Sequence, residues 1–268
     1  MDATDRWLIA LDIDGTLLHA DGTISDDVAA EVRRVACLGH EVTLATGRSA
    51  AHMRPVLSEL GLKPEYVVCS NGAITLRRDA GADDGYRREF VETFNPTEVL
   101  TAIRSHLVGG HYAVEDDTGF YRYTDVFPGN SIGSRNEKVP FEELLKHLAT
   151  RVVVISPDHH MEDFLAVVER MGLHRVSYAI GWTAWLDIAP DGVNKATALE
   201  RVRDLMGISR TRVLAVGDGR NDIDMLKWAS GWGRGVAMAH APAEVMAASN
   251  EIAASLDEDG VARLLEGF

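Results

Sequence analysis

The feature that most constrains the fold is a series of short strand-like runs, each followed by small polar or acidic residues and then by a helical pattern. Residues 7–11 form a continuous apolar run, which is typical of a strand buried on both faces. Similar runs lie at 41–45, 66–69 and 212–216, and 235–238 reads as a short final strand. Strands that alternate with helices predict an α/β fold, with a doubly wound parallel sheet covered on both faces.

The middle of the chain, about residues 84–186, has a different pattern. Strand-like segments alternate with helical ones there, and the expected strands lie at 86–91, 111–115, 120–123, 151–155, 176–180 and 185–189. Helices are expected from Asn95, near 141–149 and near 160–171. Because the α/β pattern resumes afterwards, we expect an α+β module at 84–186 inserted into a core made of 1–83 and 187–268.

Composition and charge narrow the classes of partner. The chain has 268 residues and a formal net charge of −14, so its mean field repels nucleic acid and anionic membranes. An anionic substrate needs local positive charge or a metal ion. Cys37 and Cys69 lie in apolar surroundings, and we interpret them as two buried thiols in a reducing compartment. No signal-peptide core or membrane span stands out, which favours a cytoplasmic protein.

Polar residues follow several of the predicted strands. The segments concerned are Asp12-Ile13-Asp14, Thr46-Gly47-Arg48, Ser70-Asn71-Gly72 and Gly217-Asp218-Gly219-Arg220-Asn221-Asp222. Because the carboxyl ends of parallel strands meet at one edge of a sheet, we expect these side chains to gather there. Two carboxylates spaced as in Asp12 and Asp14 suit a hard cation, or a nucleophile with an acid. By itself, this pair fits a surface turn equally well, and it also occurs in nucleotide-sugar glycosyltransferases.

In their order along the chain, these segments resemble the motifs of the haloacid dehalogenase superfamily of phosphohydrolases. The matching motifs are Asp12-x-Asp14-Gly15-Thr16, Thr46-Gly47-Arg48, Lys195 and Gly217-Asp218-Gly219-x-Asn221-Asp222. Segments 70–73, 222–226 and 259–262 are similar to the Cof-like sugar-phosphatase branch. One departure is visible, because that branch often has Asn where this chain has His240. The resemblance implies a Rossmann-like core with an inserted α+β cap that selects the substrate.

The resemblance also implies an activity, namely Mg²⁺-dependent hydrolysis of a small phosphomonoester, most simply a sugar phosphate, through an aspartyl-phosphate. Asp12 would be the nucleophile, and Asp14 would act as acid and then base. Thr46 and Lys195 would contact the transferring group. Mg²⁺ would be held by Asp12, the Asp14 backbone carbonyl and Asp218. The resemblance also implies residues that contact the substrate or support the catalytic and metal-binding groups, namely Gly47, Arg48, Ser70, Asn71, Gly72, Asn221 and Asp222.

Two alternatives stay open at this point. A phosphomutase or phosphotransferase would use the same Asp12, and a non-catalytic ligand-binding protein could keep the same fold. The glycosyltransferase interpretation predicts neither Lys195 nor the Asp218–Asp222 motif and is dropped. Expected partners are a small phosphorylated metabolite and no nucleic acid or membrane, with the chain a monomer or weak dimer. Aromatic residues of the insert could line a substrate pocket, although most are expected in its core: His111, Tyr112, Tyr121, Tyr123, Trp182 and Trp185.

Overall fold

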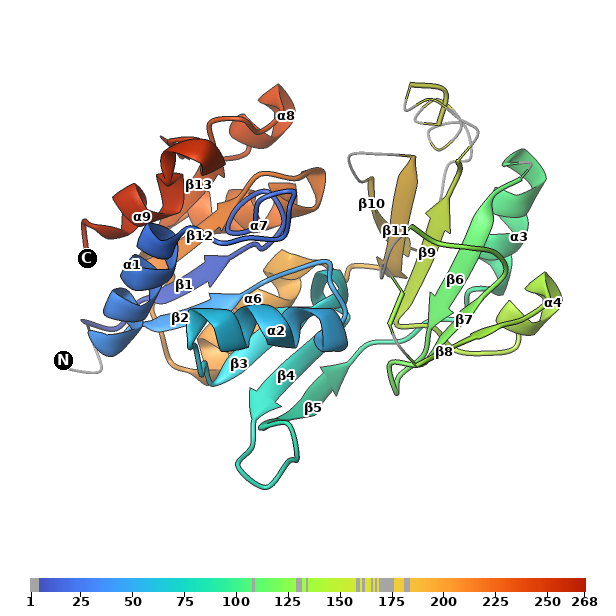
Figure 1. Cartoon of the computed structure of the whole chain (residues 1–268), viewed down its shortest axis with the longest axis horizontal. Coiled ribbons are helices and arrows are strands. Elements are labelled where there is room, and N and C mark those ends of the chain that lie inside the picture. The colour runs from blue at the N-terminus through green and yellow to red at the C-terminus, as the bar shows by residue number, and fades with distance from the viewer. Residues whose placement is uncertain are drawn as a thin grey trace. The chain divides into compact units, whose positions relative to one another are not determined.

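The computed structural model describes residues 5–107, 109–128, 132–133, 135–157, 160, 162–164, 166, 168 and 184–268, and the backbone of 176–180. The chain divides into two compact units, Met1–Glu89 with Asn194–Phe268, and Phe90–Val193. Figure 1 shows the elements of both. The predicted insert, 84–186, begins and ends several residues before the second unit does.

The first unit is built around a five-stranded parallel sheet with the strand order β14-β13-β12-β1-β2. These strands are β1 (Leu8–Leu11), β2 (Glu41–Leu44), β12 (Val213–Gly217), β13 (Arg234–Met238) and β14 (Glu251–Ala253). A parallel bridge from Ala45 to Val68 attaches β3 (Tyr66–Cys69) beside β2. Next to β3 lie β4 (Ile74–Arg78) and β5 (Tyr86–Val91) in a second sheet.

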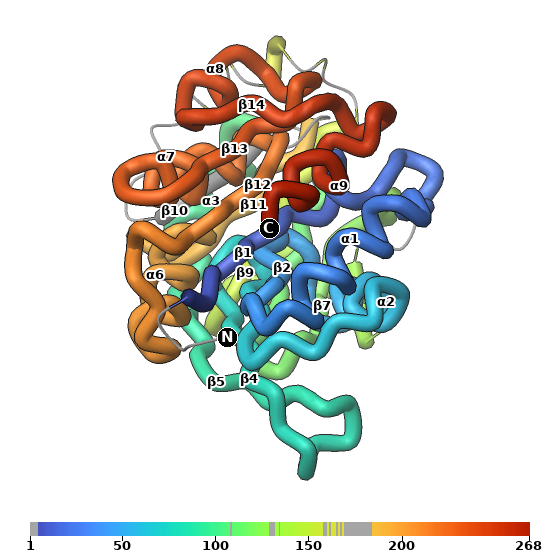
Figure 2. Tube along the Cα trace, turned by 90° about the vertical axis from the view of Figure 1, so that its left-hand side faces the viewer, coloured from blue at the N-terminus to red at the C-terminus, as the bar shows by residue number. Residues whose placement is uncertain are grey.

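Helices cover both faces of the parallel sheet, which confirms the predicted α/β class. One face packs against α1 (Asp26–Cys37), α2 (Ala50–Leu60) and α9 (Gly260–Leu265), and the other packs against α6 (Lys195–Leu205) and α7 (Ile223–Ser230). In Figure 2 the two groups lie on opposite sides of the strands. The short α8 (Ala243–Met246) packs near β13.

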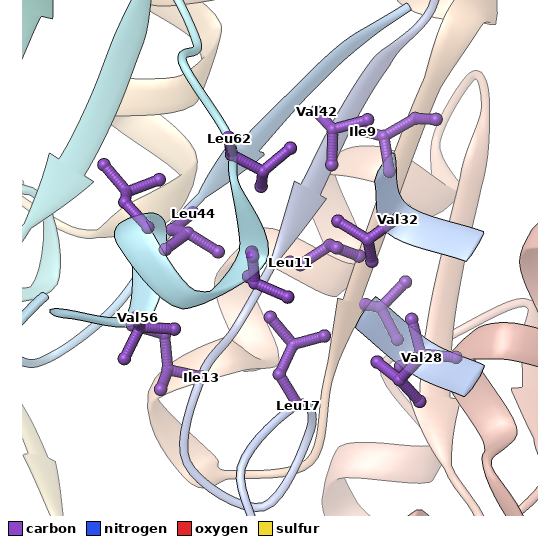
Figure 3. Packing of buried hydrophobic residues seen from close by; sticks show 14 of the residues in the cluster. Ile9, Leu11, Ile13, Leu17, Val28, Val32, Val42, Leu44, Val56 and Leu62 are labelled. Carbon is purple, nitrogen blue, oxygen red and sulfur yellow. The ribbon is translucent and has the colours of Figure 1, made fainter. Parts of the chain in front are cut away.

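The strand β1 is apolar throughout because both of its faces are buried. Ile9 and Leu11 join the cluster beneath α1 and α2, which Figure 3 shows, whereas Leu8 and Ala10 join the cluster beneath α6 and α7. All four side chains are fully buried. Hydrophobic burial therefore fixes the register of β1, and with it the place where Asp12 leaves the sheet.

The second unit is a six-stranded sheet with the order β10-β11-β9-β6-β7-β8. Its strands are β6 (His111–Glu115), β7 (Tyr121–Tyr123), β8 (Asn136–Lys138), β9 (Arg151–Ile155), β10 (Val176–Ile180) and β11 (Trp185–Pro190). Apolar side chains on one face pack against α3 (Thr97–His106) and α4 (Phe141–Leu144).

The other face of this sheet carries a polar group, which we call the Arg151 cluster: Arg151, Tyr121 and Glu115, which are buried, and Asp187, whose side chain is 15% exposed. Arg151 donates from Nε to Asp187 Oδ1 at 2.6 Å, and the Tyr121 hydroxyl donates to Glu115 Oε2 at 2.8 Å. Tyr121 is fully buried, so it belongs to the core of this unit and cannot present its ring as an exposed pocket wall there.

Several local expectations need correction. The strand 235–238 is not the last one, because β14 follows it, and the helix expected at 141–149 spans only Phe141–Leu144. Strands β4 and β8 were not anticipated. Ser25 precedes α1, where a serine side chain commonly caps a helix, but its side chain makes no capping hydrogen bond. Half of the residues of the helix expected near 160–171 lie outside the described residues, and so does Trp182.

The two cysteines differ in exposure. Cys69 is buried in β3, but Cys37 is exposed at the end of α1, so the expectation of two buried thiols was wrong for Cys37. The helical pattern points Val28, Val32 and Val35 inward, and Cys37 falls outside that stripe. Among the helices that the structure describes, none combines the length and the apolar character of a membrane span.

Candidate active site

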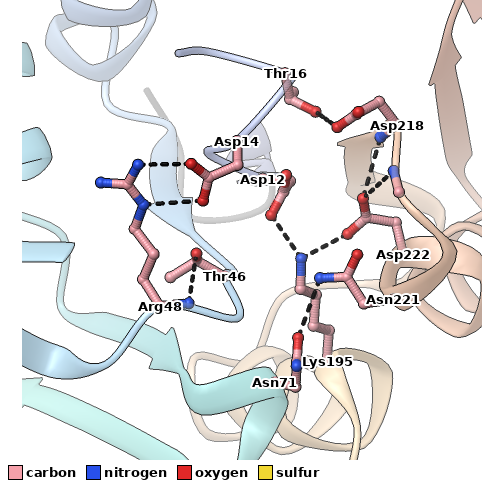
Figure 4. A network of polar contacts seen from close by, with 11 residues as sticks. Asp12, Asp14, Thr16, Thr46, Arg48, Asn71, Lys195, Asp218, Asn221 and Asp222 are labelled. Carbon is pink, nitrogen blue, oxygen red and sulfur yellow. Dashed lines mark hydrogen bonds and ion pairs between the residues drawn. The ribbon is translucent and has the colours of Figure 1, made fainter. Parts of the chain in front are cut away.

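The polar residues predicted at the strand ends lie together at the carboxyl edge of the first unit's sheet, as Figure 4 shows. Asp12 leaves the end of β1, with its backbone N–H donating to the carbonyl of Val216 in β12 at 3.0 Å. Its side chain is buried, whereas the side chain of Asp14 is 57% exposed. The first carboxylate is therefore fixed inside the site, and the second lies at its mouth.

Lys195 lies in the centre of this group. Its fully buried ammonium donates to Oδ1 of Asp12 and to Oδ1 of Asp222, each at 2.6 Å. The residue opens α6, where Asn194 caps the helix by accepting from the backbone N–H of Thr197. A side chain at Gly72 would meet the Asn194 carbonyl at 2.3 Å, so this glycine permits the close approach that places Lys195.

Asp218 and Asp222 come from the turn after β12. Asp222 Oδ2 accepts from the backbone N–H groups of Asp218 and Gly219, and its other oxygen accepts from Lys195. Asp218 Oδ1 accepts from the hydroxyl of Thr16 at 2.9 Å. Both carboxylate oxygens of Asp222 are thus engaged within the protein, which suits it to orient the site rather than to bind a ligand directly.

We call Lys195, Asp12, Asp218 and Asp222 the Lys195 cluster. Carboxylate oxygens of its three aspartates lie within 4.8 Å of one another, and all three are buried. One positive charge faces three negative charges, so the cluster carries a formal surplus of two negative charges. Such a surplus is costly in a buried place unless an external cation offsets it.

The close approach of the three carboxylates shifts the pKa values in the cluster. Burial, followed by the charge of Asp222, raises the pKa of Asp12 well above its usual range. The same two causes raise the pKa of Asp218 to about 7. Burial opposes the charged form of Lys195, but Asp12 and Asp222 outweigh it and raise the pKa of its ammonium. Lys195 therefore stays charged, while the carboxylates need further positive charge to ionise together.

The oxygen-only donor set fits Mg²⁺. Hard divalent cations of this kind prefer carboxylate and carbonyl oxygens, and a charge of two would offset the surplus of the cluster. Asp12 and Asp218 are the carboxylates suited to hold such an ion, because each is held by a protein donor at Oδ1. The carboxylate of Asp14 is already bound by Arg48, which leaves its backbone carbonyl as the group that could contribute.

Arg48 donates two hydrogen bonds to the carboxylate of Asp14, from Nε to Oδ2 at 2.9 Å and from Nη2 to Oδ1 at 2.5 Å. This is the fork-shaped geometry that guanidinium groups also use to bind phosphate. Thr46 is fully buried in the same turn, and its hydroxyl accepts from the backbone N–H of Arg48 at 3.0 Å. A phosphate entering here would compete with Asp14 for Arg48.

The segment after β3 closes one side of the site. Asn221 donates from Nδ2 to Asn71 Oδ1 at 3.1 Å, and Gly47 packs closely against the Asn71 side chain. Ser70 and Asn71 both have left-handed backbone angles, with φ of 49° and 51°. Non-glycine residues seldom adopt this conformation outside functional or tightly constrained places.

Two residues at this edge make contacts that the sequence did not predict. His240, noted in the sequence only as a departure from the usual Asn, lies 2.9 Å from the Gly15 carbonyl and 3.8 Å from Asp218 Oδ2. Thr16 belongs to a motif that the sequence analysis quoted, but its bond to Asp218 was not foreseen either. Neither contact could be inferred from spacing, because each joins residues more than two hundred positions apart.

Comparison with known proteins defines the class. The family model of the haloacid dehalogenase-like hydrolases matches residues 9–265. The 5-amino-6-(5-phospho-D-ribitylamino)uracil phosphatase YitU of Bacillus subtilis (strain 168) is 30% identical over 99% of this chain and 98% of its own. The pyridoxal phosphate phosphatase YbhA of Escherichia coli (strain K12) is 27% identical over 96% and 97%.

The solved structures agree on the fold. A subclass IIB sugar phosphatase of the haloacid dehalogenase superfamily superposes with a TM-score of 0.81, at 21% identity and with 98% of each chain covered. The chain belongs to the haloacid dehalogenase-like hydrolases, as the motifs predicted. Within that class it is a phosphoric monoester hydrolase.

Proposed function

We propose that this chain is a Mg²⁺-dependent phosphatase that hydrolyses a small phosphomonoester, a sugar or sugar-alcohol phosphate, through an aspartyl-phosphate on Asp12. The observation that carries the proposal is the Lys195 cluster, with its surplus of two negative charges at the carboxyl edge of the sheet. The name of one relative supports this substrate class, since it is a phosphatase of a phosphoribityl compound, and a second, a pyridoxal phosphate phosphatase, supports a small phosphomonoester more generally.

In the first step, Asp12 attacks the substrate's phosphorus. Lys195 orients the Asp12 carboxylate through its hydrogen bond to Oδ1. The new bond joins a carboxylate oxygen of Asp12 to phosphorus, while the bond from phosphorus to the substrate oxygen breaks. Asp14 gives a proton to the departing alkoxide. When bound, Mg²⁺ supplies positive charge that favours ionised Asp12 and offsets the charge of the phosphoryl group.

In the second step, water attacks the phosphorus of the aspartyl-phosphate. Asp14, which has lost its proton in the first step, takes one from this water, so the acid of one step becomes the base of the next. The bond between Asp12 and phosphorus breaks, which releases inorganic phosphate and restores the carboxylate. Thr46 contributes a hydrogen bond to the transferring group from its buried position.

Arg48 controls when Asp14 becomes available in this proposal. In the structure its guanidinium binds the Asp14 carboxylate, and an acid catalyst must instead carry a proton. A doubly charged phosphate competes for the same guanidinium donors, which would free Asp14 as the substrate arrives. Arg48 would then contact phosphate during turnover.

We further propose that the insert, about residues 84–186, determines which phosphomonoester is accepted. The groups of the Lys195 cluster interact with features that all phosphomonoesters share, so selectivity needs other side chains. Tyr123 and Trp185 are partly exposed within the second unit and are candidates. Replacing each by alanine should change relative kcat/KM among sugar phosphates about tenfold, which corresponds to about 1.4 kcal/mol of transition-state binding.

The test is a phosphate-release screen with Mg²⁺ and with a chelator. Its panel contains phosphorylated sugars and sugar alcohols, pyridoxal phosphate, nucleotides and one aryl phosphate. We expect release from at least one sugar or sugar-alcohol phosphate, which chelation abolishes and Mg²⁺ restores. Phosphate that appears on an added sugar acceptor in place of water would identify a phosphotransferase. Full activity after exhaustive chelation would contradict the metal requirement.

A further inference from the structure

The imidazole of His240 joins three separate segments of the first unit. Its Nε2 lies 2.9 Å from the Gly15 carbonyl, in the turn that carries Asp12 and Asp14. Its Nδ1 accepts from the backbone N–H of Leu256 at 3.4 Å, at the start of a short 3₁₀ helix, Leu256–Glu258. His240 itself follows β13. One ring therefore ties the loop after β13 to the Asp12–Asp14 turn and to the C-terminal segment.

The two partners determine which nitrogen carries the proton. The Leu256 N–H can only donate, so Nδ1 accepts, and the Gly15 carbonyl can only accept, so Nε2 donates. The tautomer with hydrogen on Nε2 makes both bonds at once. The ring is 35% exposed, so its position depends on these bonds more than on enclosure by apolar neighbours.

The turn that His240 contacts depends on a glycine. Gly15 has a φ of 81°, and a Cβ atom there would lie 2.2 Å from Asp218 Oδ2, so no other residue fits. Glycine restricts its own backbone angles less than other residues do, so the conformation of this turn depends on contacts with other segments. The Gly15 N–H donates to the Leu18 carbonyl at 3.1 Å, and His240 binds the carbonyl on the other side of the same residue.

We propose that His240 is a positioning residue: by fixing the Gly15 carbonyl, it sets the direction of the neighbouring Asp14 peptide group and its distance from Asp218. This inference rests on the proposed function, in which the Asp14 carbonyl and Asp218 hold Mg²⁺. His240 acts through Gly15 and does not itself need to touch substrate. Its loss should therefore loosen Mg²⁺ binding and slow turnover, while the affinity for the organic part of the substrate changes little.

His19 provides a matched control. It follows the same turn, and its Nδ1 lies 3.5 Å from Asp257 Oδ1 in the same C-terminal segment. It therefore joins nearly the same parts of the chain as His240, but its side chain contacts an exposed carboxylate, that of Asp257, in place of the Gly15 carbonyl. A role that is merely structural would affect both histidines alike.

The experiment titrates Mg²⁺ into the metal-free protein by calorimetry and measures steady-state kinetics with an aryl phosphate. The variants are His240→Phe, His240→Gln and His19→Phe. Phenylalanine keeps a ring without donor or acceptor, whereas glutamine can place an N–H near the position of Nε2. Thermal unfolding with a chelator present checks that each variant folds, and His240→Ala replaces His240→Phe if that variant does not.

We expect His240→Phe to weaken Mg²⁺ binding about tenfold and to lower kcat about tenfold, with KM changed less than about twofold. His240→Gln should stay within about threefold of the parent on both measures, and so should His19→Phe. Unchanged Mg²⁺ affinity and kcat in His240→Phe would overturn the positioning role, as would equal losses in His19→Phe. If the parent protein itself binds no Mg²⁺, the proposed function fails, which is a different result from a variant that matches a parent that does bind it.

Discussion

The Lys195 cluster and the Arg151 cluster each place one cation beside carboxylates in the interior of a unit, but they balance their charges differently. Arg151 pairs with Asp187 at 2.6 Å, and Asp187 Oδ2 also accepts from the Trp185 ring nitrogen at 3.1 Å. Lys195, in contrast, forms ion pairs with two aspartates, Asp12 and Asp222. The third aspartate of the cluster, Asp218, is not paired with it. The Arg151 cluster has one cation for two carboxylates, Asp187 and Glu115, so its formal surplus is one negative charge, against two in the Lys195 cluster.

This difference separates a structural arrangement from a functional one. A paired ion in the interior keeps its geometry without help from solvent or ligand, although it adds little net stability. A surplus of like charges raises carboxyl pKa values and destabilises the folded protein until a cation arrives. We therefore expect substitutions in the Lys195 cluster to affect activity most, and substitutions in the Arg151 cluster to affect folding most.

The largest expected effect is that of Asp12→Asn. The amide cannot attack phosphorus, so phosphate release should fall at least about 10³-fold. The substitution also removes one of three crowded negative charges, so the melting temperature in chelator should be unchanged or higher. Phosphate release and thermal unfolding measure the two effects. Retention of more than a few per cent of the activity would exclude Asp12 as the nucleophile.

Asp187→Asn should have the opposite effect to Asp12→Asn, because it should lower stability and leave the active site intact. It leaves the buried guanidinium of Arg151 without its charged partner, and breaking such a pair costs about 3 kcal/mol or more. We expect a clearly lower free energy of unfolding in urea, with Mg²⁺ binding by the folded protein unchanged. A variant as stable as the parent would show that the Arg151–Asp187 pair contributes nothing to folding, and the contrast between the clusters would be lost.

Asp14→Asn should separate proton transfer from phosphoryl transfer. An alkoxide leaving group needs a proton from Asp14, whereas an activated aryl oxide leaves without one. Turnover of a sugar phosphate should fall about 10²-fold, and formation of the phosphoenzyme from an aryl phosphate should fall much less. Rapid-quench kinetics on both substrates measures this. Equal losses on the two substrates would mean that Asp14 is not the acid.

The smallest effect concerns pH. Burial and Asp222 raise the pKa of Asp218 to about 7 from an ordinary 3.8, so the folded metal-free protein holds more protons than the unfolded chain between these values. The contribution of the Asp218 carboxyl to the free energy of unfolding is therefore present at low pH and is lost as the pH rises toward 7. Mg²⁺ competes with those protons, so it should raise the melting temperature more at about pH 8 than at about pH 5.5.

The control for this pH effect is Asp218→Asn, which should flatten the dependence because it removes the titrating group. A Mg²⁺-induced increase in melting temperature that is larger at about pH 5.5 than at about pH 8 would contradict the assignment of Asp218 as a ligand. The comparison uses the difference between samples with and without Mg²⁺, so the titration of groups elsewhere in the chain largely cancels.

The sequence predicts the core strands because two-sided burial leaves a plain apolar signal, as in β1. It does not predict β8, whose residues Asn136, Glu137 and Lys138 are all exposed, nor β14, a three-residue strand in which Ile252 is 56% exposed. Such short edge strands are set by pairing with a neighbour, and composition carries little trace of it.

In the candidate site, too, some features could be predicted from the sequence and others could not. Asp12, Thr46, Lys195 and Asp218 could be located from the sequence, because each follows a strand end or falls in a motif; their roles stay predictions. The Arg48–Asp14 pair and the contact of His240 with Gly15 depend on side-chain geometry across loops, which no local pattern encodes. Tyr121 was a candidate for a substrate pocket, yet it is buried with Glu115 and Arg151.

The most direct test of the account is mass spectrometry of the protein after acid quench during turnover of an aryl phosphate. With Mg²⁺ present, the peptide that contains Asp12 should gain the mass of one phosphoryl group, and neither Asp12→Asn nor the chelated parent should show that gain. A phosphoryl group on another residue, an equal yield in chelator, or active turnover with no phosphorylated peptide at any quench time would contradict the claim that the Lys195 cluster needs a divalent cation to make Asp12 a nucleophile.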